Sequence, residues 1–341
     1  MSDKQEVTQT ENGAYEVRSQ KRGCIGVLKR FWWAFLLALI CVIVLVVCLI
    51  IFVGVPNIAQ KKVNEAKLEV QGVNMLFTTP DTFKLEINST ISTDGKIKAN
   101  IDPFLGVMYL TDAGDKKPFL NINFPATNAN KHQIVNISEE VTIPDHDSFN
   151  RFNVWFFNNE TLKVTIEGKT KVQPSGLDRK YDVTFKKTIE MKGLNAFKGT
   201  TVTEGEILIK PVNGANFKAV SHIPNPSYFT LDIGNTTFAN SIDGTPIGTL
   251  WINELIVRPG INSYPVTANL DQVKVYTIAS SSKYCNSENV PVTLAGTAVS
   301  NNGQGLNYYQ AALGSAKQVV PMDIRNIIKQ SLNTTISCPT S

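Results

Sequence analysis

The residues best suited to chemistry form the tripeptide Asp145-His146-Asp147, which places three side chains of metal-ligand type next to one another. Adjacent residues of an extended loop point in different directions. The other histidines, His132 and His222, have no ligand-like spacing from the tripeptide. We therefore expect a solvated turn at this position and no metal site.

Signatures of catalysis are missing from the long C-terminal segment. It contains no Cys-x-x-Cys, Gly-x-Ser-x-Gly, His-Glu-x-x-His or phosphate-cradling glycine loop. Gly303-Gln304-Gly305 lacks the strand-to-helix context of a nucleotide loop, and the acidic residues are scattered, so no carboxylate pair stands out for general acid–base catalysis. We expect a non-enzymatic protein without a cofactor.

Binding of an apolar molecule is the remaining chemistry, because ligand pockets are largely apolar. Aromatic residues that could line a lipid-sized cavity between sheets are Trp155, Phe156, Phe157, Tyr228, Phe229 and Trp251. Ordinary core packing predicts the same residues. Both interpretations stay open.

One stretch must position the rest of the chain relative to a membrane. Residues 31–55 contain no charged side chain, and as a helix they would reach roughly 37 Å, more than the roughly 30 Å of a hydrocarbon core. The apolar region of a signal peptide is shorter and ends in a small-residue cleavage site. We therefore predict an uncleaved transmembrane helix over 31–55, with Trp32 and Trp33 at the headgroup level.

The flanking cations predict the orientation of this helix. More of them precede it (Arg18, Lys21, Arg22, Lys29, Arg30) than follow it (Lys61, Lys62, Lys67). This excess favours a cytoplasmic N-terminus and a lumenal or extracellular C-terminal segment. N-glycosylation sequons agree, since all lie after the helix, although a segment so rich in Asn, Ser and Thr would carry about as many by chance; they are at Asn88, Asn136, Asn159, Asn235 and Asn333.

The cysteines divide among the predicted compartments. Cys41 and Cys48 lie within the membrane helix, and Cys24 is a palmitoylation candidate beside the basic cluster. Cys285 and Cys338 would meet an oxidising lumen, where a bridge closing their long loop would be worth about 4 kcal/mol in the chain-entropy model. Two free thiols are the alternative.

Charge and polarity bound the partners and the N-terminal tail. A net charge of +4 on 341 residues, with no basic run outside the juxtamembrane cluster, makes nucleic acid an unsuitable partner. The expected partners are the membrane itself and a lipid or protein on the lumenal or extracellular side. Residues 1–30 are polar and basic, so we expect a disordered cytoplasmic tail.

After a linker at 56–68 with roughly helical spacing, alternation of polar and apolar residues predicts β-strands separated by Asn-Gly, Asp-Gly and Pro-Gly turns. The predicted strands are Phe83–Ile87, Leu162–Ile166, Val183–Ile189, Glu206–Lys210, Phe229–Ile233, Leu250–Val257 and Val273–Ile278. Two short helices are expected at 305–316 and 322–332, the second with Ile324, Ile327 and Ile328 on one face that packs in the core; a membrane-lying helix is the alternative. The pattern is typical of antiparallel sandwiches.

An internal repeat divides this region into two copies of one sandwich. Residues 160–168 match 288–296 at Glu, Val, Thr and Gly, and Ile143-Pro144 with Ser148-Phe149 parallels Arg258-Pro259 with Ser263-Tyr264. We predict a first sandwich at 69–195, a second at 196–320, and a C-terminal helix and tail at 321–341.

The motifs resemble those of fungal single-pass membrane proteins whose exterior region is the domain of unknown function 3712. These are similar in turn to the type-2 late-embryogenesis-abundant (LEA-2, water-stress) domains. The resemblance covers roughly 57–300, and its residues include 222–227, 229–234, Gly244, 247–248 and 258–262 in the second copy, and 124–125, 141–144, Phe149, 185–187 and 193–195 in the first. It implies fibronectin-like or immunoglobulin-like sandwiches on vacuolar, other endomembrane or cell-surface membranes, and it carries over no catalytic residue.

The sequence thus predicts an all-β, type II single-pass glycoprotein with tandem LEA-2-like sandwiches outside the cytoplasm. A binding or scaffolding module at the vacuolar or cell-surface membrane is the first function expected. A lipid-binding or lipid-transfer module is the alternative, and a glycan-directed hydrolase is a distant third.

Overall fold

The computed structural model describes residues 7–9, 15–17 and 32–338. The chain divides into two compact units, residues 1–58 and 59–341. We describe the second unit as an N-terminal half (residues 59–195) and a C-terminal half (residues 196–338).

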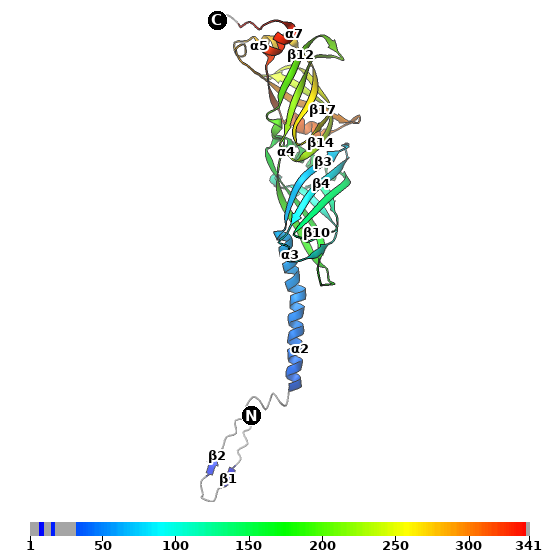
Figure 1. Cartoon of the computed structure of the whole chain (residues 1–341), viewed down its shortest axis with the longest axis vertical. Helices are drawn as coiled ribbons and strands as arrows, with labels where there is room; N and C mark the ends of the chain where they lie inside the picture. Colours follow the sequence, from blue (N-terminus) through cyan, green and yellow to red (C-terminus); the bar gives the residue numbers. More distant parts are fainter. Residues whose placement is uncertain (1–6, 10–14, 18–31, 339–341) are drawn as a thin grey trace. The chain divides into compact units, whose positions relative to one another are not determined.

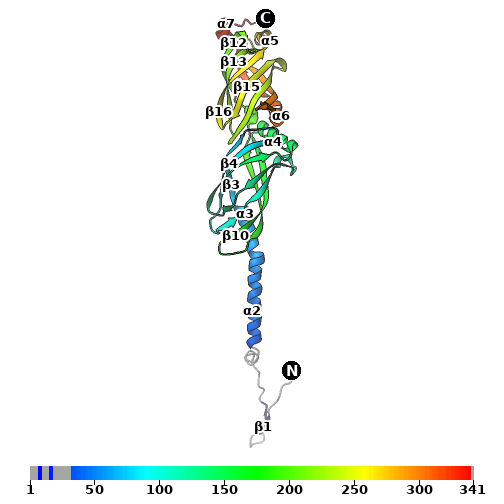
Figure 2. The same ribbon diagram turned by 90° about the vertical axis from the view of Figure 1, so that its right-hand side faces the viewer.

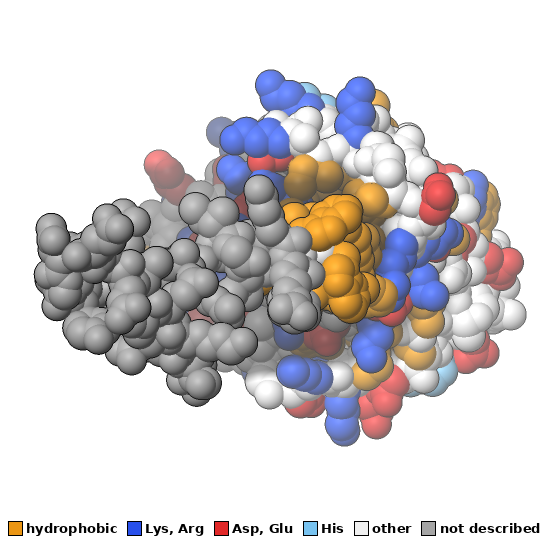
Figure 3. Space-filling view, turned by 90° about the horizontal axis from the view of Figure 1, so that it is seen from below, with side chains coloured by type: hydrophobic (Ala, Val, Ile, Leu, Met, Phe, Trp, Pro, Cys, Tyr) orange, Lys and Arg blue, Asp and Glu red, His pale blue; other side chains and the backbone are white. Residues whose placement is uncertain are grey.

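The first unit contains the apolar helix that the sequence predicts. It begins with α2 (Trp32–Leu49), passes through a π-helical stretch (Ile50–Gly54) and continues into α3 (Val55–Glu65). Among the described residues, this helix is long and apolar enough to cross a membrane, and in Figure 3 its hydrophobic side chains form a single patch. A single-pass anchor is consistent with this finding.

The N-terminal tail departs from its prediction in two places. Strand β1 (Val7–Gln9) pairs antiparallel with β2 (Tyr15–Val17), where we expected disorder. The short ladder places Val7 opposite Val17 and also contains Thr8 and Tyr15, and β-branched and aromatic residues favour strands. Cys24, the palmitoylation candidate, lies outside the described residues.

The expected linker is mostly helix. Helix α3 runs to Glu65, and Ala59 is buried against the second unit's strands. The side-chain amide of Gln60 donates to the carbonyl oxygen of Thr184 and accepts from the amide of the same residue, both at 2.8 Å. These paired bonds lie within the second unit and fix residues 59–65 of α3 to its strands, so this stretch is not a free spacer.

The N-terminal half is a two-layer sandwich (Figure 1). One layer is the six-stranded sheet with the order β7-β6-β10-β5-β8, to which β11 adds by pairing with β10. The other layer is formed by β3, β4 and β9. The strands of the N-terminal half are β3 (Lys67–Leu76), β4 (Thr82–Ser92), β5 (Ala99–Ile101), β6 (Phe104–Leu110), β7 (Pro118–Phe124), β8 (Thr127–Asn128), β9 (His132–Thr142), β10 (Thr161–Pro174) and β11 (Tyr181–Lys192).

In the C-terminal half, one curved sheet wraps around its own core (Figure 2). The strand order is β12-β13-β16-β15-β14-β17-β19, and the edge strands β12 and β19 approach each other. The curvature therefore encloses an interior, as in a barrel. The strands are β12 (Thr201–Val212), β13 (Ala215–Asn225), β14 (Phe229–Ile242), β15 (Thr245–Val257), β16 (Gly260–Leu270), β17 (Val290–Asn301), β18 (Gln304–Gly305) and β19 (Gln318–Met322).

The two halves share a sheet and a core. Phe229–Leu231 of β14 pair in parallel with Val73–Met75 of β3, so β3, β4 and β9 join the strands of the C-terminal half in one 11-stranded sheet. Helices α4 (His146–Asn158) and α6 (Asn307–Ser315) pack together beside this junction, and Phe157 contacts Tyr309 at 5.7 Å between ring centroids. The predicted boundary falls at a 3₁₀ turn, Asn195–Phe197.

Two helices were not predicted. Val273–Ile278, expected as a strand, lies in α5 (Gln272–Ala279), because the Asp271 side chain caps its N-terminus by accepting from the Lys274 amide at 3.0 Å. Asp145 caps α4 in the same way, so the expected solvated turn is a helix start. The parallel of 143–149 with 258–264 is also wrong, since the first stretch begins α4 and the second forms the β15–β16 turn.

The other predicted elements are confirmed. The remaining predicted strands lie in β4, β10, β11, β12, β14 and β15, and the two C-terminal helices are α6 and α7 (Ile324–Leu332). Ile324 and Ile328 of α7 are buried, which confirms the prediction that their face packs in the core. Gly205 of β12 leaves room for this helix, since a Cβ there would lie 2.8 Å from Cδ1 of Ile327.

Candidate apolar ligand site

An apolar cavity of about 130 Å³ lies inside the curved sheet of the C-terminal half. It occupies the end of the second unit at which α5 and α7 lie, whereas α3 enters the unit at its opposite end (Figure 1). The wall of the cavity comes from nearly every strand of the half and from both helices, as in Val202, Phe217, Leu250, Ala268, Val292 and Ile327. Many strands contribute to the wall because the sheet is pleated and alternate side chains of each strand face the interior.

The mouth of the cavity lies between α5 and α7. Tyr276 of α5 and Leu332 of α7 both line the cavity and are each 42% exposed, whereas Ala268 of β16 is fully buried. An apolar chain that enters between these side chains would exchange water for apolar walls, which is favourable.

Helix α7 is held over the cavity by several independent contacts. The β12–β13 register shifts on both sides of Ile207, and the Ile207 amide donates to Oγ of Ser331 at 3.0 Å. Nη1 of Arg325 donates to the carbonyl oxygen of Cys285 at 2.9 Å. A disulfide joins Cys285 to Cys338, beyond the end of α7. Helix α7 is therefore held near its start by Arg325, near its end by Ser331 and beyond its end by the disulfide.

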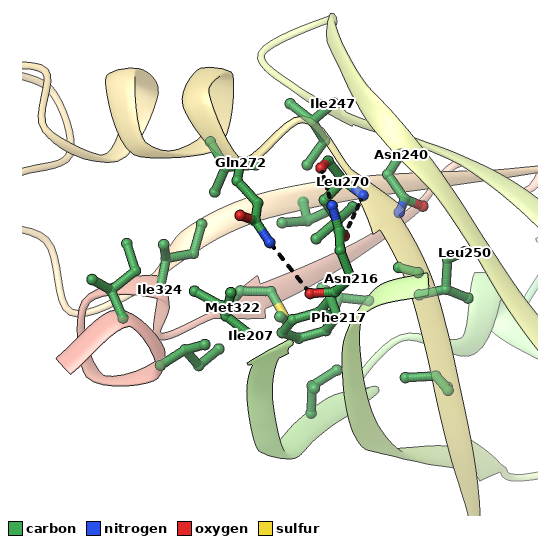
Figure 4. Close-up of a pocket in the computed structure, with 18 of the residues that line it drawn as sticks. Ile207, Asn216, Phe217, Asn240, Ile247, Leu250, Leu270, Gln272, Met322 and Ile324 are labelled. Atoms are coloured by element: carbon green, nitrogen blue, oxygen red, sulfur yellow. Dashed lines mark hydrogen bonds between the residues drawn. The ribbon is translucent and has the colours of Figure 1, made fainter. Parts of the chain in front are cut away.

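Polar groups at the cavity are few and uncharged. Asn216 binds Leu270 twice, through Nδ2 to the carbonyl oxygen at 2.7 Å and through Oδ1 from the amide at 2.8 Å. Nε2 of Gln272 donates to the carbonyl oxygen of Asn216 at 3.3 Å (Figure 4). The third amide, Asn240, is 3% exposed, and its Oδ1 has no hydrogen-bond partner. No Lys, Arg, His, Asp or Glu is among the residues that line the cavity.

A smaller cavity adjoins the first. It has a volume of about 30 Å³ and shares Val202, Leu250, Val266, Leu294 and Val320 with it. The two spaces follow the interior of the curved sheet from its covered end toward the junction of the halves.

The predicted aromatic residues do not line this site. Phe156, Phe157 and Phe229 are buried near the junction, where Phe156 and Phe229 contact at 4.7 Å between ring centroids. Tyr228 and Phe229 line a separate cavity of about 50 Å³ in the N-terminal half. Burial raises the pKa of Tyr228 to about 12. Trp155 and Trp251 are half-buried outside the described cavities.

The candidate metal residues separate in the structure. The backbone amide of Ser148 donates to Asp145 at 2.7 Å and holds the pKa of that carboxyl below its usual value. Nε2 of His146 lies 3.3 Å from Oδ1 of Asp81. Within residues 7–9, 15–17 and 32–338, no group of three or more His, Cys, Asp or Glu side chains is arranged to hold a metal ion.

The sequons occupy sites of different accessibility. Asn88, Asn136, Asn235 and Asn333 are exposed, and Asn159 is half-buried. Nδ2 of Asn159 donates to the carbonyl oxygen of Trp155 at 3.0 Å, and Oδ1 of Asn235 accepts from the Glu254 amide at 3.0 Å. Whether any of them carries a glycan stays a prediction.

Sequence reasoning missed the lining residues because strand alternation does not separate a filled interior from a hollow one. One signal was present, the isoleucine face of α7, which we interpreted as a core face with a membrane-lying helix as the alternative. Small and β-branched inward residues, such as Ala268, Val292 and Val320, were the second signal.

Comparison with known proteins gives one family match. Residues 117–240 match the model of a protein family of unknown function, DUF3712. The match crosses the junction from β7 to β14 and supports the resemblance to that domain. No curated protein matches the chain.

Solved structures give only distant likenesses. Red sea bream transglutaminase aligns at 11% identity and a TM-score of 0.26, over 68% of this chain and 29% of that chain. A bacterial adhesin from Mobiluncus mulieris, with intramolecular disulfide, isopeptide and ester bond cross-links, aligns at 10% identity and a TM-score of 0.20, over 68% of this chain and 80% of its own. The chain thus spans less than a third of the transglutaminase, and likenesses at these TM-scores do not establish a common fold.

Proposed function

We propose that this protein is a membrane-anchored binding module whose C-terminal half takes up an apolar, lipid-like ligand. The observation that carries the proposal is the cavity of about 130 Å³, which has apolar walls and a mouth between α5 and α7. Packed interiors leave few voids larger than a water molecule, so an apolar hollow of this size suggests a ligand site. This favours the lipid-binding alternative over a purely scaffolding role.

The anchor would confine the module to one membrane, although the cavity lies at the end of the second unit remote from α3. A membrane-spanning helix holds its domain at one membrane essentially irreversibly. An acyl chain or other apolar molecule in that membrane is then present at high effective concentration. We propose a cytoplasmic N-terminus and a lumenal or extracellular second unit, at the vacuolar membrane in preference to the plasma membrane. The relation to LEA-2 domains is part of the same proposal.

Native mass spectrometry tests ligand uptake. Residues 59–341, which form a compact unit with its own cores, would be secreted from eukaryotic cells and purified without detergent. We expect a fraction of the protein to carry an apolar molecule that organic solvent releases. Ala268→Leu, which fills the cavity from its buried wall, should lose that mass. A wild-type spectrum free of bound mass, unchanged after incubation with lipid vesicles, would favour the scaffolding role.

Protease protection tests the orientation. In sealed microsomes, external protease should remove only the short N-terminal tail, and glycosidase should shift the mobility of the full chain. Digestion of the second unit in intact microsomes would reverse the topology.

We further propose that the module is not an enzyme. The polar side chains at the cavity are the amides of Asn216, Asn240 and Gln272 and the phenol of Tyr276. Side-chain amides do not serve as general acids, bases or nucleophiles at neutral pH, and no Lys, Arg, His, Asp or Glu lines the wall to work with the phenol. Appearance of a product mass in the native spectra of a loaded sample would contradict this proposal.

A further inference from the structure

A groove of about 540 Å³ opens on the side of the N-terminal half, between an edge of one sheet and an edge of the other. Residues 68–71 of β3 line one bank, and residues 188–190 of β11 line the other. Tyr228 lines the end at which β14 joins β3, since its carbonyl oxygen accepts from the Val73 amide at 3.1 Å. The groove shares no lining residue with the cavity below α5 and α7.

Both banks are strand edges with no neighbouring strand. Within the described residues, β11 pairs with β10 alone, and β3 pairs with β14 only over Val73–Met75. Such an edge presents N–H and C=O groups that can pair with a further strand. At the α3 end, Gln60 already does so, because its side-chain amide donates to the Thr184 carbonyl oxygen and accepts from the Thr184 amide, as a peptide group would.

Strand β11 is the more regular of the two banks. Its ladder with β10 has no register shift, whereas the ladder of β3 with β4 shifts between Val70 and Gly72, and a bulge interrupts an edge. Backbone groups alternate between the two edges of a strand, so those of Thr188 and Glu190 face the same side as those of Thr184. An added strand would therefore pair with β11.

The side chains of the groove select the residues of such a strand. Four of them line both the groove and the apolar cavity of about 50 Å³ behind it: Leu68, Val70, Ile189 and Tyr228. The charged residues of the groove wall, Glu69 and Glu190, are both acidic and exposed. An anionic lipid headgroup would be repelled by these carboxylates, and an acyl chain would leave the edge of β11 unpaired.

We infer that the groove binds an extended segment of another protein, in which apolar residues alternate with lysine or arginine, as a strand added to β11. The alternation follows from the pleat, which turns successive side chains to opposite faces. One set covers the apolar floor, and the other set lies near Glu69 and Glu190. The groove follows residues 68–71 of β3, so about four residues of the segment lie in it.

Fluorescence anisotropy with the full chain in phosphatidylcholine nanodiscs tests this inference, with empty nanodiscs as the blank. The probe is a labelled heptapeptide of alternating lysine and valine with blocked ends. We expect saturable binding and slower amide hydrogen exchange in Lys186–Glu190. Serine in place of valine should weaken binding about tenfold or more, and glutamate in place of lysine about three- to tenfold. Of two peptides methylated at alternate amide nitrogens, the one that loses the donors facing β11 should not bind.

Thr188→Pro tests the edge itself. The N–H of Thr188 faces the groove, so proline removes a donor to the added strand and no bond to β10, and the lysine–valine peptide should bind about tenfold more weakly. Thr188→Ala is the matched control, because both substitutions remove the hydroxyl that lies 2.7 Å from Oγ1 of Thr165. It should bind the peptide as the wild type does.

Charge reversal tests the selection of basic residues. Glu69→Lys/Glu190→Lys should prefer the glutamate–valine peptide to the lysine–valine peptide. Glu140→Lys/Glu288→Lys, which changes two exposed glutamates outside the groove, should keep the preference of the wild type.

Binding of both methylated peptides as tightly as the parent would overturn the inference, and so would equal wild-type affinity for the lysine and glutamate peptides. These comparisons use the wild-type chain and stand even if a variant does not fold. Ala268→Leu, which fills the other cavity, should leave peptide binding unchanged. Failure of the peptide to bind would leave the proposed uptake of an apolar ligand intact.

Discussion

The two halves of the second unit differ in how their interiors are filled. The enclosed cavity of the N-terminal half is about 50 Å³, beside a more open groove of about 540 Å³ lined by residues 68–71, 188–190 and Tyr228, and the cavity of the C-terminal half is about 130 Å³. Aromatic side chains account for the difference, since the smaller cavity is walled by rings from several elements: Phe83, Phe119, Phe124, Phe149, Phe152 and Phe229. In the larger cavity, aliphatic side chains predominate, and Phe217 and Tyr276 are the aromatic residues of the wall. Similar sheets thus enclose a filled core in one half and a hollow in the other.

The helices that pack over the two interiors also differ: α4 carries aromatic side chains inward, and α7 carries isoleucines. Helix α4 sends Phe152 against Phe119 at 4.1 Å between ring centroids, and the rings are stacked. Helix α7 sends isoleucines toward a space they do not fill. The comparison indicates that the inward side chains of a covering helix, more than the sheet beneath it, decide whether a ligand can enter.

The largest effect is expected where the filled interior is emptied. Phe152→Ala removes a ring that is 4% exposed and stacked on Phe119, so we expect the free energy of unfolding to fall by about 3–5 kcal/mol. Because both halves share one core cluster, the loss should appear in a single urea transition monitored by circular dichroism. Two separated transitions would instead favour independent halves.

The disulfide should matter next, and only around the hollow interior. It ties the segment after α7 to the segment after α5. Its loss in Cys285→Ser/Cys338→Ser should lower the free energy of unfolding by about 2–4 kcal/mol. Hydrogen exchange should rise in α7 and leave β4 and β9 unchanged. Cys41→Ser is the matched control, since this residue is a free cysteine of α2; equal protection of α7 in both variants would contradict the prediction.

Most of the fold could be predicted from the sequence because strand alternation and turn residues are local signals. Apolar and polar residues alternate in Phe83–Ile87 and in Leu162–Ile166, and both segments lie in strands. Val273–Ile278 shows the limit of this reasoning, since its β-branched residues indicated a strand, whereas the Asp271 cap and the packing of α5 over the cavity made a helix. Tertiary context overrides propensity in such short segments.

The site was less predictable than the fold. Its residues come from strands and helices spread between Val202 and Leu332, and nothing local marks them as lining a space. The parallel pairing of β14 with β3 is likewise a long-range contact that no local pattern encodes. The aromatic residues that we singled out belong to the junction and the filled half, because large rings fill space and do not leave it.

A smaller effect is expected at the wall of the hollow. Ile327→Ala removes carbon atoms that already border empty space, so fewer contacts are lost than at Phe152. We expect a loss of about 1–2 kcal/mol in the free energy of unfolding, below the range of about 2–5 kcal/mol usual for this substitution in a filled core. Urea unfolding measures the difference. A loss as large as that of Phe152→Ala would show that the two interiors are equally packed.

The smallest effect concerns pH and belongs to the filled half. Tyr228 lines the smaller cavity, and burial raises its pKa from 10.0 to about 12, so the folded protein keeps the phenol neutral where the unfolded chain ionises. The resulting stability is fully present below pH 10 and is lost as the pH rises toward 12. Tyr228→Phe removes this contribution, so the wild type should lose about 1 kcal/mol more than the variant between pH 9 and 11. Tyr308 and Tyr309, whose pKa values burial also raises, are present in both proteins and cancel in the difference. Urea titrations at the two pH values measure it, and parallel losses would mean that water reaches the Tyr228 hydroxyl, making the N-terminal interior less closed than its aromatic wall implies.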